Sequence, residues 1–532
     1  MEKNMSMYAY LVERVQDLDR EIIIYQNNKI SARELFADIN AVSTFLYELG
    51  IRKGDSVGLC LPNIPQAVVA IYAINKLGAV VNAIHPRLKD KALYSALEKT
   101  NTKVVFMYDF MVLKHNKTLK DKGIKIISCA YSDYLKGIKK FYKWGFIPYL
   151  SKNIYPYSAT LKHTKELDIE VNGLLDAIYL HSSGTSGYSK TVKLSSYAFN
   201  ALSDNIYNMI TNKAKVALSA SDTMLMTLPV FHGFGLGVCV HFSLSHFKVC
   251  LVPFFHSKYV RYSFRNNDIN FITAVPNMLR KITNDKKFSA SYLQSVKLVF
   301  SGGDKLSDKV KDDFNALLKS GGAKCKIMEG YGLSELASVV SINIFPDKNN
   351  SQGLPLPSVD IVVVDGDKVL PPDKVGEICV YSQSVMTGYL DDDSAPFILI
   401  EGKKYLRTGD LGCLDCDGFI YIKDRIKRIA IIGGINIYPK EVETLISSIE
   451  GIKACCVARY EYQGKVMTKA FVELEKNFSL NAKLQAKIKD TVENGIMKYA
   501  VPTIIEQVDK IKLNKMGKVD YLYYENLLKS NN

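Results

Sequence analysis

The chain has 532 residues, a length that suggests about three or four domains or subdomains instead of one compact core. Hydrophobic residues make up 47% and charged residues 23%, a composition that excludes a disordered or collagen-like chain. The formal net charge of +15 fits an anionic partner, but it does not distinguish phosphates from nucleic acid or a membrane face.

The N-terminus and the cysteines favour a cytoplasmic location. Residues 1–5 contain charged side chains instead of an apolar run, so we expect no secretory signal. The ten cysteines show no regular spacing, which favours reduced thiols. Cys413 and Cys416 form a CxxC pair without a second pair at zinc spacing, and we interpret them as small residues beside a turn at 415–418.

The first third of the chain alternates short strands with helical patterns. A strand is predicted at 56–61, followed by a helix with Asn63 as its N-cap and Pro65 in its first turn, ending at about Leu77. Repetition of this kind builds a parallel sheet with helices on its faces. Further strands are predicted at 79–84, 103–108 and 124–128.

A second set of strands is predicted in the middle of the chain, at 223–228, 271–275, 296–301 and 326–329. The longest apolar stretch, 223–255, is interrupted by histidines, glycines and Pro229. A membrane-spanning helix needs about 20 mostly uncharged residues, so we interpret this stretch as buried core.

The pattern changes after about residue 345. Strands are predicted at 360–364, at Val369 and at 377–381, with a tight turn at 365–366, which indicates a small antiparallel subdomain. A basic stretch at 423–428 precedes the last mixed segment, and we place a hinge there.

Basic and aromatic residues alternate at 139–146. Such a segment can lie at a membrane surface. It can equally be a partly buried connecting loop, and the sequence leaves both interpretations open.

The strongest local motif is a loop rich in serine, threonine and glycine that ends at Lys190 and follows an apolar run at 174–180. Glycines let backbone N–H groups approach an anion, hydroxyls donate to phosphate oxygens and Lys190 supplies charge. The loop is not a Walker A motif, because two residues separate Gly187 from Lys190. Taken alone, it would more often be a plain surface loop.

A second motif, at 328–335, follows a predicted strand. Its tyrosine, Tyr331, offers an aromatic face to a base, and the hydroxyl of Ser334 with the carboxylate of Glu335 suits Mg²⁺. Further motifs follow at 406–412, 433–443 and 513–520.

Together, in this order and over nearly the whole chain, these motifs resemble the adenylate-forming superfamily of acyl-CoA synthetases, peptide-synthetase adenylation domains and luciferases. The resemblance implies an α/β fold. Its large N-terminal AMP-binding domain, 1–423, would hold two parallel-sheet α/β subdomains at about 1–170 and 171–345 and a small β-barrel-like subdomain at 346–423. It also implies a hinge at 424–428 and a small, mobile α+β C-terminal lid domain at 429–532.

The resemblance implies roles for individual residues in binding ATP. Tyr331, followed by Gly332, matches the residue that stacks on adenine, in a pocket lined by Gly303 and Asp304. Asp410 matches the carboxylate that holds both ribose hydroxyls. The residues that match the loop around the β- and γ-phosphates are Ser182, Ser183, Gly184, Thr185, Ser186, Gly187 and Lys190.

The same resemblance implies the chemistry. Ser334 and Glu335 match residues that contact the α-phosphate and Mg²⁺, and Arg425 resembles a second ribose or phosphate contact. Lys518 matches the lysine that bridges the attacking carboxylate and the α-phosphate, where two anions must meet. After an acyl-adenylate forms, the C-terminal domain would swing to admit a thiol.

The hinge and the thiol path also have counterparts in the sequence. Arg428 stands at the hinge position, where the family usually has Asp or Lys, and Gly433 and Gly434 lie where the pantetheine of CoA would pass. Elsewhere the family often has Pro-Lys-Gly at 189–191 and a histidine at 196, whereas this chain has Ser-Lys-Thr and Ser196. None of these departures removes a group that the chemistry requires.

The segment around His232 bears on the acid that is activated. Amino-acid-activating members place an aspartate near this position, and none occurs between Thr227 and Val240, so an α-amino acid is disfavoured. His232 looks like the gating histidine of acyl- and aryl-CoA ligases, and glycines at 233, 235 and 237 leave space for a chain or ring. We therefore expect a fatty or aromatic acid.

The acceptor and partners stay more open. CoA is the expected acceptor, and the thiol of a phosphopantetheinyl carrier protein is the alternative. A basic nucleic-acid-binding protein is a less favoured interpretation, because Lys and Arg are spread along the chain without a recognised module. We expect a cytoplasmic enzyme with a possible peripheral membrane contact through 139–146, and the oligomeric state is open.

Overall fold

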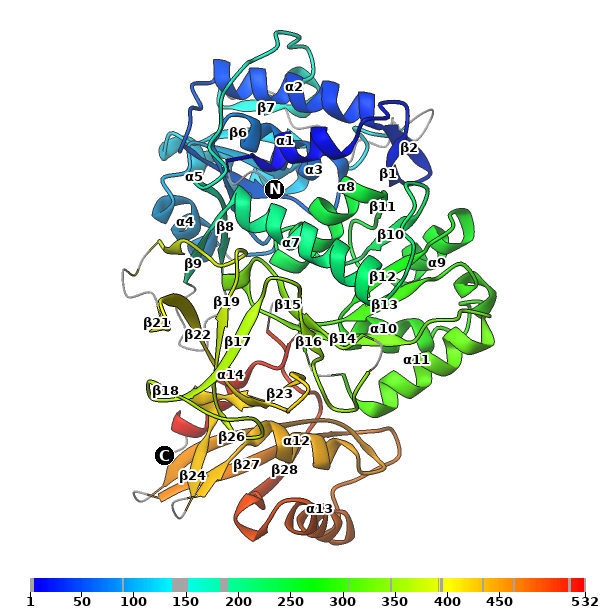
Figure 1. Cartoon of the computed structure of the whole chain (residues 1–532), viewed down its shortest axis with the longest axis vertical. Coiled ribbons are helices and arrows are strands. Elements are labelled where there is room, and N and C mark those ends of the chain that lie inside the picture. Colours follow the sequence, from blue (N-terminus) through cyan, green and yellow to red (C-terminus); the bar gives the residue numbers. More distant parts are fainter. Residues whose placement is uncertain are drawn as a thin grey trace.

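The computed structural model describes residues 4–530 except 89, 136–151, 182–189, 305, 345–346, 391, 393–395, 433–434, 463–464 and 515–517. Two large mixed sheets with helices form the upper part of the molecule in Figure 1, a small antiparallel sheet lies below them, and the C-terminal residues lie at the bottom. The α/β fold with a small C-terminal domain is confirmed.

The first large sheet has eight strands in the order β20-β9-β8-β4-β3-β5-β6-β7. Its strands from β3 to β8 pair in parallel, as the alternation of strands and helices predicts, and β9 and β20 are antiparallel. The bounds are β3 Ser56–Cys60, β4 Val80–Ala83, β5 Val104–Tyr108, β6 Lys125–Cys129, β7 Ile154–Pro156, β8 Asp176–His181, β9 Thr191–Ser195 and β20 Gly388–Tyr389.

The second large sheet has nine strands in the order β16-β15-β14-β13-β12-β10-β11-β1-β2. Strands β10 to β14 and β1 run parallel to their neighbours, and the outer strands β2, β15 and β16 are antiparallel. The bounds are β1 Glu21–Tyr25, β2 Asn28–Ser31, β10 Thr223–Met226, β11 Lys248–Leu251, β12 Phe271–Ala274, β13 Leu298–Ser301, β14 Ile327–Gly332, β15 Val339–Ile342 and β16 Leu354–Pro355.

The two sheets do not follow the expected boundary near residue 170. Strands β8 and β9, which lie after it, belong to the first sheet. Strand β1, which lies before it, pairs with β11 of the second sheet, and β2 pairs with β1. A boundary drawn along the sequence misses this exchange, because local patterns predict that a strand exists but not which strand it pairs with.

Helices cover and separate these sheets. Helix α3 is buried at every residue, so it has no solvent face and belongs to the core between the sheets. The helices of the N-terminal domain are α1 Met7–Arg14, α2 Ala32–Glu48, α3 Pro65–Lys76, α4 Asp90–Lys99, α5 Asp109–Asp121, α6 Tyr157–Thr160, α7 Ser196–Asn208, η2 Met209–Lys213, η3 Phe234–Phe242, α8 Ser243–His246, α9 Ser257–Asn266, α10 Pro276–Thr283, η4 Ala290–Leu293, α11 Asp308–Ser320 and η5 Ser334–Leu336.

The prediction that Asn63 caps helix α3 is wrong. The N-cap is Ile64, whose side chain makes no capping bond, although Pro65 does occupy the first turn. The amide of Asn63 instead donates to the carbonyls of Leu228 (3.0 Å) and Val252 (3.1 Å) and accepts from the N–H of Val230 (2.9 Å). Long-range backbone partners therefore replaced the local cap, and they fix the loop that leads to His232.

The small antiparallel sheet has six strands, as the pattern after residue 345 indicates, and Asp365-Gly366 forms its tight turn with a positive φ at Gly366. Asp415 and Gly418 close the expected turn beside Cys413 and Cys416. All ten cysteines are free. The strands are β17 Asp360–Asp365, β18 Lys368–Val369, β19 Gly376–Tyr381, β21 Phe397–Ile400, β22 Lys403–Leu414 and β23 Ile420–Arg425.

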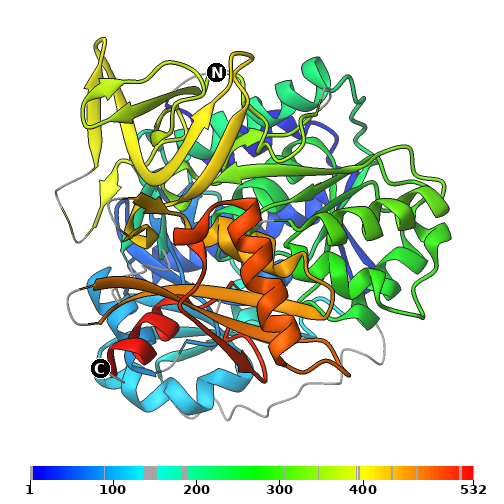
Figure 2. The ribbon, with the colours of Figure 1, turned by 90° about the horizontal axis from the view of Figure 1, so that it is seen from below.

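The C-terminal part has its own core. Figure 2, the view from below, shows α13 lying across the strands of the sheet β26-β27-β28, and apolar side chains of α12 and α13 pack on that sheet. The bounds are η6 Ile426–Arg428, β24 Ala430–Ile432, β25 Ile435–Ile437, α12 Pro439–Ser447, β26 Ile452–Tyr462, β27 Lys465–Leu474, α13 Ala482–Gly495, η7 Lys498–Ala500, β28 Ile504–Val508 and α14 Tyr521–Ser530.

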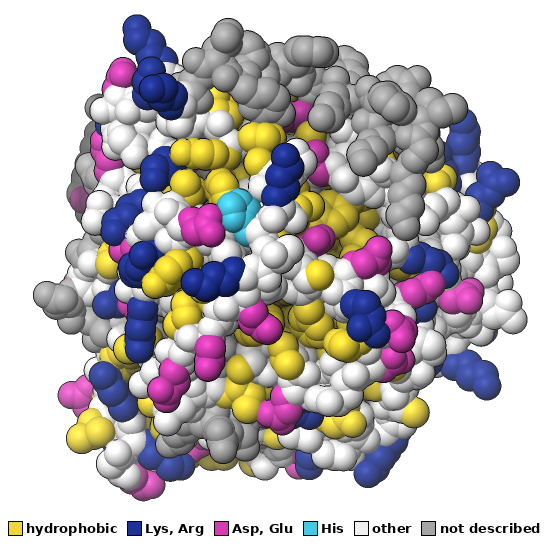
Figure 3. Space-filling model, turned by 90° about the horizontal axis from the view of Figure 1, so that it is seen from above, with side chains coloured by type: hydrophobic (Ala, Val, Ile, Leu, Met, Phe, Trp, Pro, Cys, Tyr) yellow, Lys and Arg dark blue, Asp and Glu magenta, His cyan; other side chains and the backbone are white. Residues whose placement is uncertain are grey.

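The apolar stretch 223–255 is buried core, as expected. It contains β10, β11 and the π-helix η3, which is buried from Gly235 to Phe242. In the described ranges, no helix has both the length and the apolar character needed to cross a membrane. On the face seen from above in Figure 3, Lys and Arg side chains lie among Asp and Glu side chains instead of forming one basic block.

Candidate active site

A cavity of about 620 Å³ lies where the second large sheet, the small antiparallel sheet and the loop that carries Lys518 meet. Its volume falls within the usual range for sites that bind small molecules. One end is polar and the other is lined by apolar side chains. Of the expected site residues, those that line it are Lys190, His232, Gly303, Tyr331, Gly332, Ser334, Glu335, Arg425 and Lys518.

Three residues at the polar end form a connected group. Tyr331, at the end of β14, donates from its hydroxyl to Oδ2 of Asp410 at 2.6 Å. The Nε atom of Arg425 lies 2.7 Å from Oδ1 of the same carboxylate, because Asp410 on β22 and Arg425 on β23 are register partners. Asp410 itself is 3% exposed. Tyr331 and Arg425 thus line the cavity, and the buried Asp410 carboxylate binds both of them.

Glu335, in the 3-10 turn η5 that follows β14, adds a carboxylate to this end. The hydroxyl of Tyr389 donates to Oε1 of Glu335 at 3.0 Å. In the described ranges, no three His, Cys, Asp or Glu side chains gather to hold a metal alone. Mg²⁺ needs only one or two protein carboxylates when phosphates supply further oxygens, so the donor set of Ser334 and Glu335 fits it.

Lys190 lies immediately before β9, beside the same tyrosine. Its Nζ atom is 2.9 Å from Oδ2 of Asp392 and 4.3 Å from the centre of the Tyr389 ring. The residues expected to hold phosphates before it, 182–187, lie outside the described residues, as do Gly433, Gly434 and the segment 139–146.

Lys518 reaches the cavity from the C-terminal domain. Its backbone forms a turn with Asn514, in which each N–H donates to an oxygen of the other residue. Its Cε atom lies 3.9 Å from the position that a Cβ atom on Gly303 would occupy. Burial lowers the pKa of Lys518, while the carboxylate of Asp304 opposes this effect and thus lies within electrostatic range.

The apolar end of the cavity extends into the main core between helix α7 and the π-helix η3. Ile206 of α7 and Phe242 of η3 are 2% and 1% exposed, yet both line the cavity. π-helical turns often occur at functional sites. The apolar lining residues are Ile206, Leu228, Val238, Phe242, Val275, Met278, Phe300, Val339 and Ile342.

His232 lines the cavity next to this apolar end. Burial lowers its pKa to about 3, and the nearby His85 and Lys518 act in the same direction. The imidazole is therefore neutral at neutral pH. The glycine beside it is required by packing, because a Cβ on Gly233 would lie 2.3 Å from the carbonyl oxygen of Ala337. A Cβ on Gly235 would lie 2.0 Å from the carbonyl oxygen of Pro229.

Arg428, at the expected hinge, is held by a buried cluster. Its guanidinium lies 2.9 Å from Glu443 and 3.2 Å from Asp424, and its Cζ atom is 3.5 Å from the centre of the Tyr521 ring. Tyr521 begins α14, three residues after Lys518, and donates to Glu443 at 3.0 Å. The cluster connects the hinge position to the loop of Lys518.

Sequence reasoning missed several residues of this site. His85, Ile206, Phe242 and Tyr389 all line the cavity, but none lies in a motif that we singled out for the chemistry. No local signal identifies them, because the fold brings them in from four separate segments. Asp304 and Asp410 do not line the cavity directly but act on residues that do.

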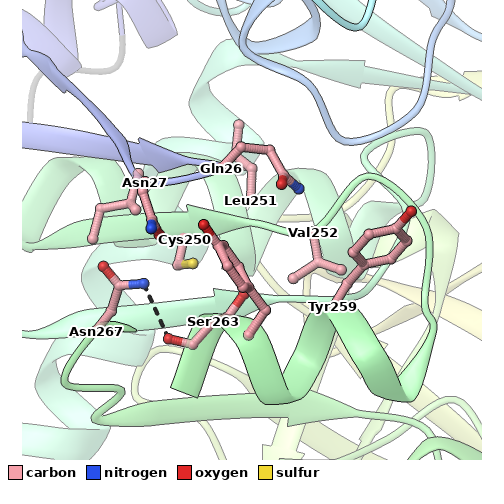
Figure 4. Close-up of a pocket in the computed structure, with 10 residues that line it drawn as sticks. Gln26, Asn27, Cys250, Leu251, Val252, Tyr259, Ser263 and Asn267 are labelled. Atoms are coloured by element: carbon pink, nitrogen blue, oxygen red, sulfur yellow. Dashed lines mark hydrogen bonds between the residues drawn. The ribbon is translucent and has the colours of Figure 1, made fainter. Parts of the chain in front are cut away.

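A second, much smaller cavity of about 10 Å³ lies between β1, β11 and α9. Figure 4 shows its lining, including the bond that the amide of Asn267 donates to the carbonyl oxygen of Ser263 at 3.0 Å. This volume is about the minimum that one water molecule needs. It is too small for a substrate.

The chain belongs to the family of AMP-binding enzymes. The family's main domain matches residues 12–390, and the C-terminal domain of AMP-binding enzymes matches residues 441–518. These matches confirm the resemblance to the adenylate-forming superfamily that the sequence motifs indicate.

Similar proteins cover nearly the whole chain. A long-chain-fatty-acid–CoA ligase of Bacillus subtilis is 27% identical, over 94% of this chain and 90% of its own. ATP-bound MatB from Rhodopseudomonas palustris is 21% identical and superimposes with a TM-score of 0.85 over 99% of both chains. The O-succinylbenzoate coenzyme A synthetase MenE of Bacillus subtilis, with ATP and magnesium, is 24% identical with a TM-score of 0.77, over 98% of this chain and 99% of its own. Both structural likenesses establish the shared fold.

Proposed function

We propose that the protein is an ATP-dependent acyl-CoA ligase. It activates a carboxylic acid as an acyl-adenylate, releases pyrophosphate and transfers the acyl group to the thiol of CoA. One observation carries this proposal: Lys518, Tyr331 and Arg425 line the same cavity as the apolar end, and the buried Asp410 carboxylate holds Tyr331 and Arg425 in place. The names of similar proteins, which include fatty-acid and aromatic CoA ligases, support it.

The polar end would hold ATP. The ring of Tyr331 stacks on adenine, with Gly303 and Gly332 beside it, and the Asp410 carboxylate accepts from both ribose hydroxyls. A carboxylate suits two neighbouring donors because it offers two oxygens. Arg425 contacts ribose or phosphate, while Lys190 and the preceding residues 182–187 hold the β- and γ-phosphates.

The first step joins two anions. A carboxylate oxygen of the acid attacks the α-phosphorus, a new O–P bond forms, and the bond to the bridging oxygen of pyrophosphate breaks. The ammonium of Lys518 bridges the attacking carboxylate and the α-phosphate, which lowers the repulsion between them. Ser334 contacts the α-phosphate. Glu335 would hold Mg²⁺, which supplies charge neutralisation on the phosphate oxygens when it is bound.

The second step needs a path for a thiol. The thiol loses its proton to solvent and its sulfur attacks the acyl carbon. A C–S bond forms, the C–O bond to AMP breaks, and AMP leaves with the oxygen that joined it to the acyl group. The C-terminal domain rotates about Arg428 and withdraws Lys518. The resemblance assigns the pantetheine path to Gly433 and Gly434, which lie outside the described residues. Neutral His232 serves as a gate between the acyl end and this path.

The apolar end favours a fatty or aromatic acid. The carboxylates among the described lining residues, Glu335 and Glu377, belong to the polar end, where Tyr389 and Arg407 bind them. An α-ammonium group would therefore be buried without a counter-ion, at a large free-energy cost. Apart from Lys518, the cations among the described lining residues also lie at the polar end. A second negative charge on the acid would therefore lack a partner, so we expect the rest of the acid to be uncharged.

Two further expectations belong with this proposal. The acceptor is CoA, with a phosphopantetheinyl carrier protein as the alternative that the test below distinguishes. The protein acts in the cytoplasm, and peripheral membrane contact through 139–146 stays a prediction from the sequence.

The proposal is tested by pyrophosphate exchange with ATP, Mg²⁺ and a panel of acids. The panel contains straight-chain fatty acids of increasing length, benzoate, dicarboxylates and α-amino acids. We expect exchange with fatty acids or benzoates and little with the charged-tail acids. Acyl transfer is then measured with free CoA and with a phosphopantetheinylated carrier protein. If none of these acids supports pyrophosphate exchange, the proposed ligase activity is contradicted. If the acyl group is transferred only to the carrier protein, the carrier protein and not CoA is the acceptor.

A further inference from the structure

Tyr389 lies between two groups of opposite charge in the polar end of the cavity. Its hydroxyl donates to Oε1 of Glu335 at 3.0 Å, and its ring faces the ammonium of Lys190, whose Nζ atom lies 4.3 Å from the ring centre. Lys190, Glu335 and Tyr389 all line the same cavity. One side chain therefore contacts both a cation and an anion that belong to different parts of the chain.

The backbone holds this tyrosine at the junction of both segments. Tyr389 on β20 is the register partner of Val192 on β9, two residues after Lys190, and the N–H of Leu390 donates to the carbonyl of Thr191 at 2.8 Å. On the other side, the N–H of Met386 donates to the carbonyl of Glu335 at 2.8 Å. The segment 386–390 thus links the strand of Lys190 to the turn of Glu335.

The side chain of Tyr389 is also poised to stay a donor. It is 7% exposed, and its hydroxyl already donates to Glu335. A phenol carries its proton at neutral pH, so this hydroxyl is available as a donor.

We propose that Tyr389 is a positioning residue that keeps Lys190 and Glu335 apart and aimed into the cavity. Opposite charges that line one cavity attract each other. An aromatic face attracts the ammonium and a phenol hydroxyl binds the carboxylate, so each charge has a partner other than its opposite. Asp392 adds a second contact to Lys190 at 2.9 Å.

This inference rests on the proposed roles of Lys190 in binding phosphate and of Glu335 in binding Mg²⁺. The tyrosine would preserve both roles at once, because it fixes the Glu335 carboxylate for a metal and the Lys190 ammonium for a phosphate. The hydroxyl positions Glu335 for the metal, and the ring positions Lys190 for phosphate. Substitutions can therefore test the two functions separately.

The test compares Tyr389→Phe, which removes the hydroxyl, with Tyr389→Leu, which removes the ring as well. For each, the binding of ATP is measured by titration calorimetry with Mg²⁺ and with a chelator, without any acid present. For Tyr389→Phe we expect affinity for Mg²⁺-ATP to fall about tenfold, the effect of one lost bond to a charged group, with metal-free ATP affinity nearly unchanged. For Tyr389→Leu we expect metal-free ATP affinity to fall as well, by about threefold.

The matched control is Tyr405→Phe. Tyr405 also donates to a carboxylate, Oδ2 of Asp360 at 2.6 Å, but it lies in a separate cluster of the small antiparallel sheet and does not line the cavity. Its variant should bind both forms of ATP like the wild type.

Equal affinity of Tyr389→Phe and wild type for Mg²⁺-ATP would overturn the inference, and so would an equal loss for both forms of ATP, which indicates a merely structural role. Wild-type protein that binds no ATP contradicts both proposals. If the wild-type protein binds Mg²⁺-ATP but no acid of the panel supports pyrophosphate exchange, only the ligase function is contradicted. The comparison of ATP affinities still tests the role of Tyr389 in that case.

Discussion

The hydroxyl of Tyr331 and the carboxylate of Asp410 are joined by a hydrogen bond of 2.6 Å, although 78 residues lie between them in the sequence. Arg425 binds the other oxygen of the same carboxylate at 2.7 Å. Because both oxygens are held, the carboxylate has one orientation before any nucleotide arrives. A group fixed in this way loses little further freedom on binding, which favours affinity.

Asp410→Ala should weaken ATP binding. The substitution removes the proposed ribose acceptor and leaves Arg425 without the carboxylate that it pairs with. We expect the KM for ATP in pyrophosphate exchange to rise at least about tenfold, an effect that exceeds the loss of one neutral hydrogen bond. Tyr331→Phe keeps the stacking ring and should raise the KM for ATP less than Asp410→Ala does. An unchanged KM in Asp410→Ala argues against a ribose contact.

Lys518 should give adenylation an alkaline limit. Because burial lowers its pKa, the ammonium is lost at a lower pH than in an exposed lysine, and adenylation should fall as pH rises through that value. Lys518→Arg keeps the charge, so its profile of kcat/KM against pH should stay flat to higher pH. Lys518→Ala should lose about a hundredfold or more in adenylation.

The control for Lys518→Ala is the second step. Thioester formation from supplied acyl-adenylate should be nearly intact in this variant, because Lys518 is withdrawn from the site in that step. Equal losses in both steps would contradict the proposed role.

Val238→Ala should extend the range of acids. Val238 lies on η3 and lines the apolar end, whereas Val240 on the same helix is buried but does not line the cavity. Both alanine variants should cost about 2 kcal/mol of stability. Only Val238→Ala should shift the preferred chain length upward in the exchange assay, with the KM for ATP unchanged. Identical shifts in both variants would locate the acyl group elsewhere.

His241 should contribute to acid sensitivity of the fold. It is fully buried, with Nδ1 3.1 Å from the hydroxyl of Tyr72 and Nε2 2.9 Å from Oδ1 of Asn200, and burial lowers its pKa to about 3. The unfolded chain therefore binds a proton below pH 6.5 that the folded protein does not accept. Stability should fall as pH decreases from 6.5 towards 3, by about 1.4 kcal/mol per pH unit from this group.

His241→Gln tests this prediction, since glutamine keeps a donor and an acceptor but does not titrate. Urea unfolding midpoints should depend less on pH in the variant than in the wild type between pH 6.5 and 5, whereas the two dependences should coincide above pH 7. Parallel curves over the whole range would show that His241 is not responsible.

Local patterns predicted much of the fold. Strands β3, β5 and β13 lie within a few residues of their predicted positions, because short apolar runs bounded by turns specify buried strands. The same reasoning failed for Asn63, where the amide found backbone partners at Leu228 and Val252 instead of its own helix. A side chain that can cap a helix can also cross-link two distant loops, and only tertiary structure decides between them.

The site shows a similar division. Tyr331, Glu335 and Lys518 lie in recognisable motifs, and the fold brings all three to one cavity. Tyr389 and Ile206 belong to no such motif, because their contribution depends on which strand or helix packs beside them. A single tyrosine in a short strand gives no sign in the sequence that it will contact both Lys190 and Glu335.

The pairing of β1 with β11 has a consequence for biosynthesis. Ile23 leaves the ribosome long before Val249, its partner in the second sheet, and the whole first sheet up to β9 is made in between. The hairpin of β1 and β2 is therefore synthesised well before β11, with which β1 pairs. Contacts between segments so distant in the sequence form slowly. Deleting residues 1–31 would make β11 an exposed edge strand of the second sheet, and such an edge can promote self-association during synthesis.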